Sequence, residues 1–390
     1  MQTDVSIVGG GVIGSLMALK LAKEGLSINL IERNAEQYFN DSPLTYGRTI
    51  ALNLSSIDFL KGIDIWDKVD SNSYSFDRIY VLDSEGSTPL EFNSETINQD
   101  YLGKIVHYNF LLRQIRNKIS YLSNVNIFYD FEVKSLNSYE NKIAIESSKG
   151  ESLDSSLIVG ADGSFSSVRR LLSIPTRSWS YKQKAFVATI NTQKNFPYTA
   201  FQLFTPYGPI ALLPLRKNEY SLIWSVNQDK FKTLVSLSKK EFSLELARSL
   251  ENKFGNIRIC GELFNFPLNQ IHAKTYFSER SVLIGDAIHT IHPLAGQGFN
   301  LGIADISDLS DRILKERRLG KSIYNPNILS GYESSRKPIN LRMIFAMEAF
   351  KQGFSNSNPW IAFARNLAFK LTNQNERIRK EFIKIAAGII

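Results

Sequence analysis

The amino-terminal residues form a regular pattern of apolar stretches around a glycine-rich turn. Apolar runs at Asp4–Val8 and Ser27–Glu32 have the length and composition of buried strands. Between them, the turn Gly9–Gly14 leads into Val12–Glu24, where apolar residues recur at helical spacing. The order of strand, glycine turn, helix and strand predicts the opening of a βαβ unit with a parallel sheet.

Later stretches follow a different pattern. Tyr80–Phe92 and Lys184–Gln228 alternate between apolar and polar residues and are interrupted by Pro and Gly, which predicts an antiparallel sheet. The α/β pattern resumes at Ser281–Gly285, where a strand runs into a second glycine-rich turn and a helix. Beyond about Lys337 the pattern is helical to the end of the sequence.

These changes predict an α/β fold with an α+β insert, in which a Rossmann-like domain is interrupted by a mostly antiparallel sheet domain and followed by C-terminal helices. The expected boundaries are residues 1–75, 100–180 and 270–340 for the Rossmann-like domain, 76–99 and 181–269 for the sheet domain, and 341–390 for the C-terminal helices.

Composition narrows the class of protein. A chain of 390 residues with 43% hydrophobic and 22% charged residues is large enough for two domains, and it fits neither wholesale disorder nor a multi-span membrane protein. The single cysteine, Cys260, cannot pair within the chain and favours a reducing compartment, while Cys-based metal sites are excluded by count. No signal or transit peptide is visible ahead of the first strand, so we expect a cytoplasmic protein.

The formal net charge of +8 suits an anionic partner such as a cofactor phosphate, nucleic acid or lipid head groups. Nucleic-acid binding would need a basic stripe with interleaved aromatic residues or a known module, and neither is visible, so we expect none. His289 and His292 are three residues apart in a predicted turn and lack accompanying carboxylates, so no metal site is expected. His107 and His272 are isolated and are interpreted as hydrogen-bonded polar residues rather than catalysts.

The first chemical motif is the turn itself. Gly9 allows a tight turn, Gly11 a close approach of a pyrophosphate, and Gly14 close packing of the helix on the strand, while the helix N-terminus offers free N–H groups to phosphates. Glu32 ends the second strand 18 residues after Gly14 and can accept both hydroxyls of an adenosine ribose. This arrangement predicts a dinucleotide site that favours FAD or NAD over NADP.

Two further motifs follow predicted strands. At Ile158–Ser164 an apolar strand ends at Asp162 and Gly163, and an Asp or Ser N-cap then begins a helix. At Val282–Asp305 a strand delivers Gly285 and Asp286 to a turn, and Pro293, Gly296 and Gly298 lead into a helix whose N-terminus would face the same site. Asp286 can hydrogen-bond a polyol, and such a helix end would stabilise negative charge on a reduced flavin.

Together, these three motifs resemble those of the group A flavoprotein aromatic hydroxylases, the para-hydroxybenzoate hydroxylase-like family. The stretch His292–Gly302 with Asp305 resembles the signature of the ring hydroxylases of ubiquinone biosynthesis, and the resemblance covers essentially the whole chain. Two shorter stretches also resemble the family's sequences: Gly208–Leu215, and Arg48 with Ala51 and Leu52.

The resemblance implies FAD as the cofactor and roles for particular residues. Gly9, Gly11, Gly14 and Glu32 would hold the ADP half, Asp286 the ribityl chain, and Asp162 and Gly163 would match a motif implicated in contact with both FAD and NAD(P)H. The flavin would be lined by Pro293–Asn300, including Gly296, Gln297, Gly298, Phe299 and Asn300, with Arg48 nearby; Arg33 and Arg113 complete the expected cofactor-binding set. Pro293, Gly298 and Arg48 are the expected catalytic positions, and His289 is expected to pack beside the flavin.

The sequence departs from the family pattern at two places. Ile288 stands where the family usually has a second alanine after Gly-Asp, and Tyr108-Asn109 stands where it usually has Glu-Asn.

By resemblance, the expected reaction is hydroxylation of the ring of a polyprenylated phenol on the path to ubiquinone, with O2 reacting at reduced FAD to give a C4a-hydroperoxide. NAD(P)H is the expected electron donor, although a single Rossmann-type glycine motif predicts no separate domain for it, so the reductant would reach the flavin from a surface groove or electrons would come from a partner protein. Side chains of the predicted sheet such as Phe201, Leu203 and Trp224 are expected to shape the substrate pocket.

Three alternatives remain. A flavin-dependent halogenase is disfavoured because the tryptophans are isolated from one another. A flavin-dependent isoprenoid reductase would not consume oxygen. The third is a low-turnover flavin-binding scaffold in a quinone-synthesis complex.

The C-terminal segment adds a possible membrane partner. Trp360, Phe363, Ala364, Leu367 and Leu371 fall on one helical face, and basic residues outnumber acidic ones over 360–390. Two interpretations stay open, a helix packed on the protein core and a helix that docks on the inner membrane surface.

Overall fold

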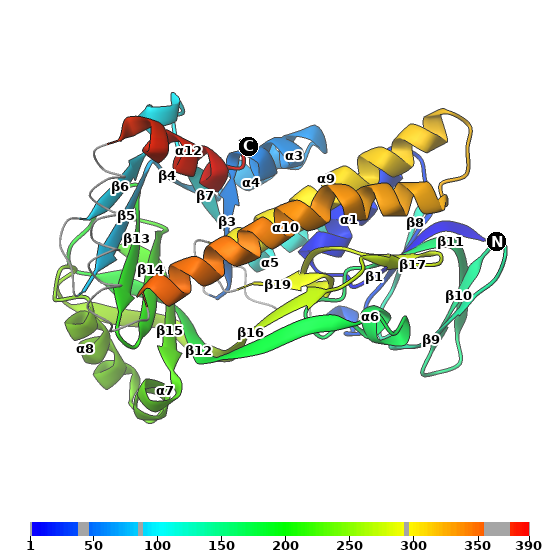
Figure 1. The fold of residues 1–390 in the computed structure, drawn as a ribbon. Helices are drawn as coiled ribbons and strands as arrows, with labels where there is room; N and C mark the ends of the chain where they lie inside the picture. Colours follow the sequence, from blue (N-terminus) through cyan, green and yellow to red (C-terminus); the bar gives the residue numbers. More distant parts are fainter. Residues whose placement is uncertain (1, 38–46, 85–88, 292–295, 355–374, 390) are drawn as a thin grey trace.

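The molecule has a sheet at each end, joined by long strands and a long helix (Figure 1). The computed structural model describes residues 2–37, 47–84, 89–291, 296–354 and 375–389, and statements about the structure refer to these residues. Strands β12 (Thr176–Thr192) and β16 (Ile257–Ala273) and helix α10 (Pro326–Phe354) run between the two ends.

The first sheet is the Rossmann-like one. In the described part of the chain it has the order β17-β18-β11-β1-β2-β8, and the hairpin β9–β10 continues from β11. Its strands are β1 (Thr3–Val8), β2 (Ile28–Ile31), β8 (Val125–Phe128), β9 (Val133–Ser138), β10 (Ile143–Ser147), β11 (Ser152–Gly160), β17 (Phe277–Ser278) and β18 (Ser281–Leu283). Strands β8, β2, β1, β11 and β18 are parallel, as expected for strands joined by crossover connections.

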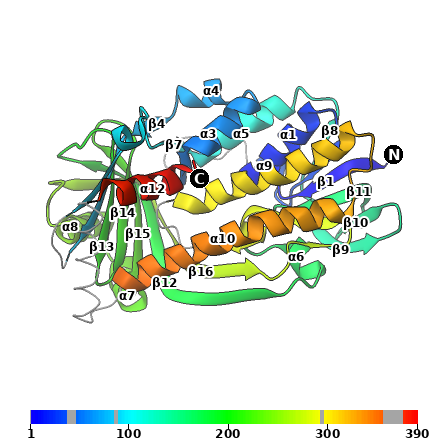
Figure 2. The same cartoon turned by 45° about the horizontal axis from the view of Figure 1, so that its top comes forward.

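Helices cover this sheet. The helices α1 (Val12–Lys23), α5 (Tyr108–Ile119) and α9 (Gln297–Arg318) pack together, with α1 in contact with both of the others (Figure 2). The apolar spacing that predicted α1 places Leu16, Leu19 and other side chains fully out of solvent. The core of this end of the molecule forms because the parallel strands β1, β2 and β18, with both faces covered, bury nearly every side chain.

The second sheet has the order β19-β16-β12-β15-β14-β13-β5-β6 within the described residues. Its further strands are β5 (Arg78–Asp83), β6 (Leu90–Asn93), β13 (Thr199–Thr205), β14 (Gly208–Pro214), β15 (Glu219–Asn227) and β19 (His289–Thr290). Neighbouring strands are antiparallel except β13 and β5, which confirms the expected mostly antiparallel sheet.

One face of the second sheet is covered by α7 (Gln228–Val235) and α8 (Lys239–Ser249). Trp224 and Leu203 lie in this core and are 1% and 2% exposed, and Phe201 packs against the same core. The expectation that these three side chains shape a substrate pocket is therefore wrong, because alternation along the strands turns them toward the helices and away from the first sheet.

A small third sheet lies between the other two. It consists of β3 (Thr49–Asn53), β7 (Gly103–His107) and β4 (Tyr74–Phe76), accompanied by α3 (Leu54–Gly62), α4 (Trp66–Asp70) and the 3-10 helix η1 (Ser94–Ile97). The hydroxyls of Thr49 and Ser221 lie 2.7 Å apart, so the uncovered face of the second sheet meets β3. This sheet was not predicted from the sequence.

The carboxyl-terminal helices differ from the expected boundaries. Helix α10 is continuous from Pro326 to Phe354 and crosses the expected boundary at residue 341. It is followed, after a segment outside the described residues, by α12 (Glu376–Ala387). The apolar positions Trp360, Phe363, Ala364, Leu367 and Leu371 lie outside the described residues.

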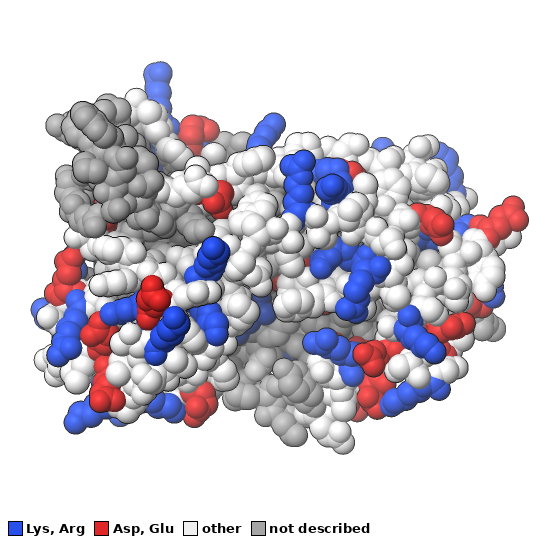
Figure 3. Space-filling view, turned by 60° about the horizontal axis from the view of Figure 1, so that its bottom comes forward, with Lys and Arg blue, Asp and Glu red and all other residues white. Residues whose placement is uncertain are grey.

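No helix among the described residues is long and apolar enough to cross a membrane. Acidic as well as basic side chains occur over both ends of the face in Figure 3, so on this face the basic residues are not gathered at one end.

Candidate cofactor site

The three sequence motifs converge at one edge of the first sheet. Val8 is in register with Gly160, and Gly160 with Leu283, so the carboxyl ends of β1, β11 and β18 lie side by side. Each of the three strands runs directly into one of the motifs. This edge of a parallel sheet is where open α/β folds bind their ligands.

The turn after β1 is shaped by its glycines. Gly9 has φ +110°, and a Cβ there would lie 2.4 Å from the carbonyl oxygen of Ala161; a Cβ on Gly14 would lie 1.9 Å from the carbonyl oxygen of Gly9. These positions therefore admit no side chain without a backbone shift. The N-terminus of α1 has no side-chain cap and no acidic residue in its first turn, which leaves positive potential facing the turn.

Glu32 fixes the same turn from the second strand. The side chain is 6% exposed, and its two carboxylate oxygens accept hydrogen bonds from Gly10 N and Asn34 N, both at 2.9 Å. Arg116 on α5 donates to the carbonyl oxygen of Gly10 at 2.6 Å. The Gly10 peptide is thus held at both its N–H and its C=O, which preorganises the turn; the predicted contact of Glu32 with a ribose stays a prediction.

Asp162 organises the second motif. One of its oxygens, Oδ2, accepts hydrogen bonds from the backbone N–H groups of Ser167 and Val168 at 2.6 and 3.1 Å, at the start of α6 (Ser167–Leu171). The Ser166 hydroxyl caps the same helix by accepting from Arg169 N at 2.9 Å, so both of the alternative N-cap residues take part. Asp162 Oδ1 is buried and has no hydrogen-bond partner within the described ranges.

The third motif presents a single polar side chain at the turn. Ser281–His289 is buried throughout except at Asp286, in the 3-10 turn η2 (Gly285–Ala287). Gly285 has φ +60° and faces Ile13 of α1. Arg169 donates to the carbonyl oxygens of Ala287 and Ser164, both at 2.7 Å, and so ties the second motif to the third.

Helix α9 begins beside this turn. Gly296 is its N-cap, with φ +64° and no side-chain cap, and the first turn carries no acidic residue, so its N-terminus also presents positive potential. A Cβ on Gly296 would lie 3.0 Å from Ala51 Cβ, and one on Gly298 would touch Ile291. Gln297 is 7% exposed and Phe299 packs on the core of the first sheet.

Asn300 has partners that the sequence did not predict. Its Oδ1 accepts from Asn53 N and the Ser56 hydroxyl at 3.1 and 2.7 Å, and its Nδ2 donates to the carbonyl oxygens of Ala51 and Gly296 at 2.9 and 3.3 Å. The amide is fully used in joining α9 to β3. Its hydrogen bonds support a role in placing the start of α9 rather than direct contact with a cofactor.

Arg48 and Tyr108 lie beside the N-terminus of α1. The guanidinium of Arg48 lies 4.9 Å from the centroid of the Tyr108 ring, and Val12 N donates to the Tyr108 hydroxyl at 3.2 Å. A Cβ on Gly11 would lie 2.9 Å from that hydroxyl, so Tyr108 faces the N-terminus of α1. Arg33 is exposed and Arg113 is partly buried on α5, while Pro293 lies outside the described residues.

Two of the histidines, His272 and His289, are buried and hydrogen-bonded. His289 is fully buried with Nε2 2.7 Å from an oxygen of Asp305, so its ring is turned to that carboxylate. His272 Nε2 lies 3.0 Å from the Tyr276 hydroxyl, and burial, with smaller contributions from His289 and nearby basic side chains, lowers the pKa of His272 to about 4. Burial also lowers the pKa of His107. Among the described side chains no group of three His, Cys, Asp or Glu could hold a metal ion.

These features fit a dinucleotide with a flavin. Two uncapped helix N-termini without acidic residues suit pyrophosphate oxygens and the electron-rich end of a flavin, and the glycine turns leave space that a Cβ would fill. Asp286 suits a polyol, and the unpartnered Asp162 Oδ1 is a further polar atom at the same edge.

Sequence reasoning missed several residues that hold the site together. Arg116 and Arg169 lie in helices at positions that, from the sequence, cannot be told from solvent-exposed basic residues. Their carbonyl partners come from distant segments. Arg336 lies about 30 residues beyond the third motif. The one feature of the sequence that could have identified any of these arginines was the position of Arg169 shortly after the Asp162-Gly163 pair.

Comparison with known proteins places these features in a family. A family model described as an FAD binding domain matches residues 2–345. The chain is 31% identical to ubiquinone hydroxylase UbiL of Rhodospirillum rubrum over 99% of this chain and 90% of that protein. It is 29% identical to 3-demethoxyubiquinol 3-hydroxylase of Escherichia coli (strain K12) over 99% of each chain.

Solved structures agree on the fold. The p-nitrophenol 4-monooxygenase PnpA of Pseudomonas putida DLL-E4 superposes with a TM-score of 0.79 at 18% identity and covers 98% of this chain and 97% of its own. PqsL of Pseudomonas aeruginosa, a probable FAD-dependent monooxygenase, also gives 0.79 at 21% identity, covering 95% of this chain and 100% of its own. The expected α/β fold with its inserted sheet is confirmed.

Proposed function

The chain belongs to the family of FAD-binding flavoprotein monooxygenases that includes the ubiquinone hydroxylases, and from this premise we propose that it hydroxylates the aromatic ring of a polyprenylated phenol in ubiquinone biosynthesis. The observation that carries the proposal is the convergence of three strand ends and the α9 N-terminus on one site, in a chain whose relatives are named as ubiquinone hydroxylases over its full length.

FAD supplies the redox chemistry and the activation of O2. The proposed protein ligands are Gly9, Gly11, Gly14 and Glu32 for the ADP half, Asp286 for the ribityl chain, Asp162 and Gly163 at the adjacent turn, and the start of α9 for the flavin ring. The uncapped N-terminus of α9 supports the last assignment, because it would stabilise negative charge there. Pro293, Gly298 and Arg48 remain the proposed catalytic positions.

The substrate would enter between the flavin and the second sheet. The face of that sheet opposite α7 and α8 carries Thr189, Ser221 and Ala211, and it meets β3 through the contact of Ser221 with Thr49. The same face also carries the apolar residues Val187, Leu213 and Ile223, which would keep water from the reaction. We propose this face, rather than the aromatic core beneath α7 and α8, as the source of substrate specificity.

The test is oxygen uptake by the purified full-length holoenzyme with a synthetic polyprenylphenol and NADH or NADPH, with the product identified by mass spectrometry. A product heavier by one oxygen atom, with oxygen consumed in step, supports the proposal. Saturation of a prenyl double bond without oxygen uptake would instead establish the isoprenoid reductase. Retained FAD with no turnover on any prenylphenol and either donor would favour the scaffold.

The electron donor is part of the same proposal. We propose NAD(P)H, and comparing the rate of FAD reduction by NADH and NADPH under anaerobic conditions tests it directly. Failure of both nucleotides to reduce the bound flavin would point to a protein donor instead. Membership of a quinone-synthesis complex and a cytoplasmic location stay predictions.

A membrane surface is the proposed partner of α12. The helix packs inward through Ile383 and Ala387, which are 2% exposed, while Ile378, Phe382 and Ile385 on the opposite side are 42%, 42% and 47% exposed. Its basic residues, Arg377, Arg379, Lys380 and Lys384, outnumber Glu376 and Glu381. An anchored helix with an exposed apolar stripe and a basic excess suits an anionic lipid surface, where a prenylated substrate would reside.

Cosedimentation with vesicles of phosphatidylglycerol and phosphatidylcholine tests this partner. The triple substitution Ile378→Ser, Phe382→Ser and Ile385→Ser should abolish cosedimentation with anionic vesicles. The matched control is Leu244→Ser on α8, which removes an apolar side chain of similar exposure, 53%, from another helix. Equal binding by the triple variant and the control would refute docking through α12.

A further inference from the structure

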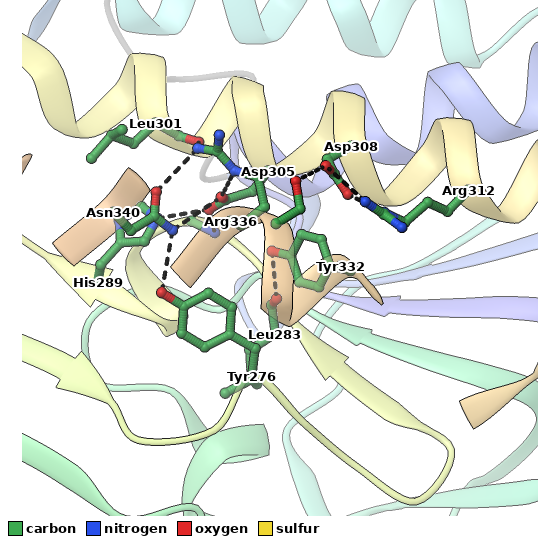
Figure 4. Close-up of polar contacts among 12 residues, drawn as sticks. Tyr276, Leu283, His289, Leu301, Asp305, Asp308, Arg312, Tyr332, Arg336 and Asn340 are labelled. Atoms are coloured by element: carbon green, nitrogen blue, oxygen red, sulfur yellow. Dashed lines mark hydrogen bonds and ion pairs between the residues drawn. The ribbon is translucent and has the colours of Figure 1, made fainter. Parts of the chain in front are cut away.

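A fully buried carboxylate lies behind the turn that carries Asp286. Asp305 of α9 is 0% exposed, and both of its oxygens are occupied (Figure 4). Oδ2 accepts from Gly285 N at 3.1 Å and lies 2.7 Å from His289 Nε2. Oδ1 accepts from Arg336 Nε at 2.9 Å and Asn340 Nδ2 at 3.3 Å.

The charges in this cluster balance. Arg336 of α10, whose side chain is 7% exposed, is the basic partner of Asp305. Burial alone raises the pKa of Asp305, but His289 and Arg336 outweigh it, and the pKa is lowered overall. The carboxylate is therefore ionised at neutral pH, and all four of its partners act as donors. An amide in its place could accept only part of this set and would turn its own N–H groups toward other donors.

Two of the four contacts bracket Asp286. Gly285 precedes it directly and His289 follows three residues later, so the Asp305 carboxylate holds the turn on both sides of its one partly exposed side chain. The other two contacts come from α10, whose Tyr332 hydroxyl also donates to the carbonyl oxygen of Leu283 at 3.1 Å.

The cluster continues away from the site. Asn340 also donates to the Tyr276 hydroxyl at 3.4 Å (Figure 4). That hydroxyl lies 3.0 Å from His272 Nε2. One helical turn along α9, Asp308 pairs with Arg312 of the same helix and accepts from the Ser335 hydroxyl, without touching the turn. Asp305 and Asp308 are thus two acidic residues of α9 that both contact α10, of which only one reaches the Asp286 turn.

We propose that Asp305, held by Arg336, is a positioning residue that sets the place of Asp286 and thereby the affinity for FAD. The inference rests on the proposed role of Asp286 as the ligand of the ribityl chain. Loss of the carboxylate would free the turn on both sides of Asp286 while leaving the glycine turn of β1 and α1 in place.

The first experiment measures the Kd of FAD for apoprotein by quenching of flavin fluorescence. Asp305→Asn should raise the Kd by about tenfold or more, the scale of one charge-assisted hydrogen bond. Asp308→Asn, the matched control, should leave it unchanged. An unchanged Kd in Asp305→Asn, or an equal loss in both variants, would overturn the proposal.

A charge-neutral variant separates positioning from folding. Asp305→Asn leaves Arg336 buried without its partner, so it can destabilise the fold by that route alone. The double variant Asp305→Asn, Arg336→Met removes both charges and should recover the melting temperature of the apoprotein while FAD binding stays weak. Recovery of both properties would show that Asp305 only balances charge, and the proposal would fail.

A double-mutant cycle with Asp286→Asn identifies the route. If Asp305 acts through Asp286, Asp305→Asn should change the Kd of FAD little once Asp286 has been replaced. Full additivity, with Asp286→Asn alone weakening FAD binding, would overturn the inference and leave the role of Asp286 intact. No effect of Asp286→Asn alone would refute that role, and the inference with it.

Discussion

The two glycine turns of the site are held in different ways. At the turn of Gly9–Gly14, a Cβ on Gly9 or Gly14 would collide with the backbone of Ala161 or Gly9, and Gly10 is held by Glu32 at the end of β2 and by Arg116 of α5. The turn of Gly285–Ala287 is fixed from outside, by Asp305 of α9, Arg169 of α6 and Tyr332 of α10. Both turns have polar partners, but the first also excludes side chains from Gly9 and Gly14 by direct backbone contact, whereas the second is held mainly by polar side chains of other elements.

This difference predicts that the two turns respond differently to substitutions and to pH. Steric exclusion does not change with pH and is broken by adding one carbon atom. A buried polar cluster tolerates small changes of volume better, but responds to the loss of a partner or a change of protonation.

The largest expected effect is in the first turn. Gly14→Ala places a Cβ 1.9 Å from the carbonyl oxygen of Gly9, which cannot move without displacing β1. We expect a loss of about 3 kcal/mol in the free energy of unfolding, measured by urea denaturation of the apoprotein. The control is Gly62→Ala in α3, where a Cβ meets nothing within 4 Å and alanine should be neutral or stabilising. Similar losses in both variants would contradict steric exclusion at Gly14.

The next effect concerns pH and the polar cluster that extends from the second turn through Asn340 and Tyr276 to His272. Burial lowers the pKa of His272 from 6.5 to about 4, so the unfolded chain takes up this proton first as the pH falls. Stability is therefore full above about pH 6.5 and decreases below it, and between pH 7 and pH 5 this residue should remove about 2 kcal/mol from the free energy of unfolding. Denaturation by urea at pH 7, 6 and 5 measures the slope.

His272→Gln is the matching variant, because glutamine can still hydrogen-bond the Tyr276 hydroxyl but does not titrate in this range. Its stability should fall distinctly less between pH 7 and pH 5. If the variant keeps the full slope of the unmodified protein, the pH dependence arises elsewhere.

The smallest effect is expected at Arg169, which links the second and third motifs of the site. Arg169→Met removes hydrogen bonds to the carbonyl oxygens of Ala287 and Ser164 and should cost about 1 to 2 kcal/mol of stability. FAD binding should weaken with it, because both turns lose a shared support. The exposed neighbour Arg170→Met serves as the control. Equal stability and FAD affinity in both variants would remove Arg169 from the site.

The sequence predicted the site at the level of its backbone. Gly9, Gly14 and Gly285 are visible because only glycine fits such turns, and their order after apolar strands was sufficient to predict a parallel sheet and a dinucleotide site. Arg116 and Arg169 were not recognised, because an arginine that reaches a distant carbonyl has the same local pattern as a solvated one. Trp224 was misplaced because period-two alternation defines two faces without stating which one faces the first sheet.

Strand and helix periodicity, the glycine turns and the acidic residues that follow strands were determined by the sequence itself, because each depends on steric and solvation preferences of neighbouring residues. The tertiary structure decided which carboxylates form hydrogen bonds within the protein and which stay partly exposed. Glu32 and Asp305 are both acidic residues near glycine turns, yet both are used by backbone N–H groups, and Asp286 alone remains partly exposed in its stretch. That division depends on which donors the folded chain brings within hydrogen-bonding distance, and residues up to 35 positions away supply them.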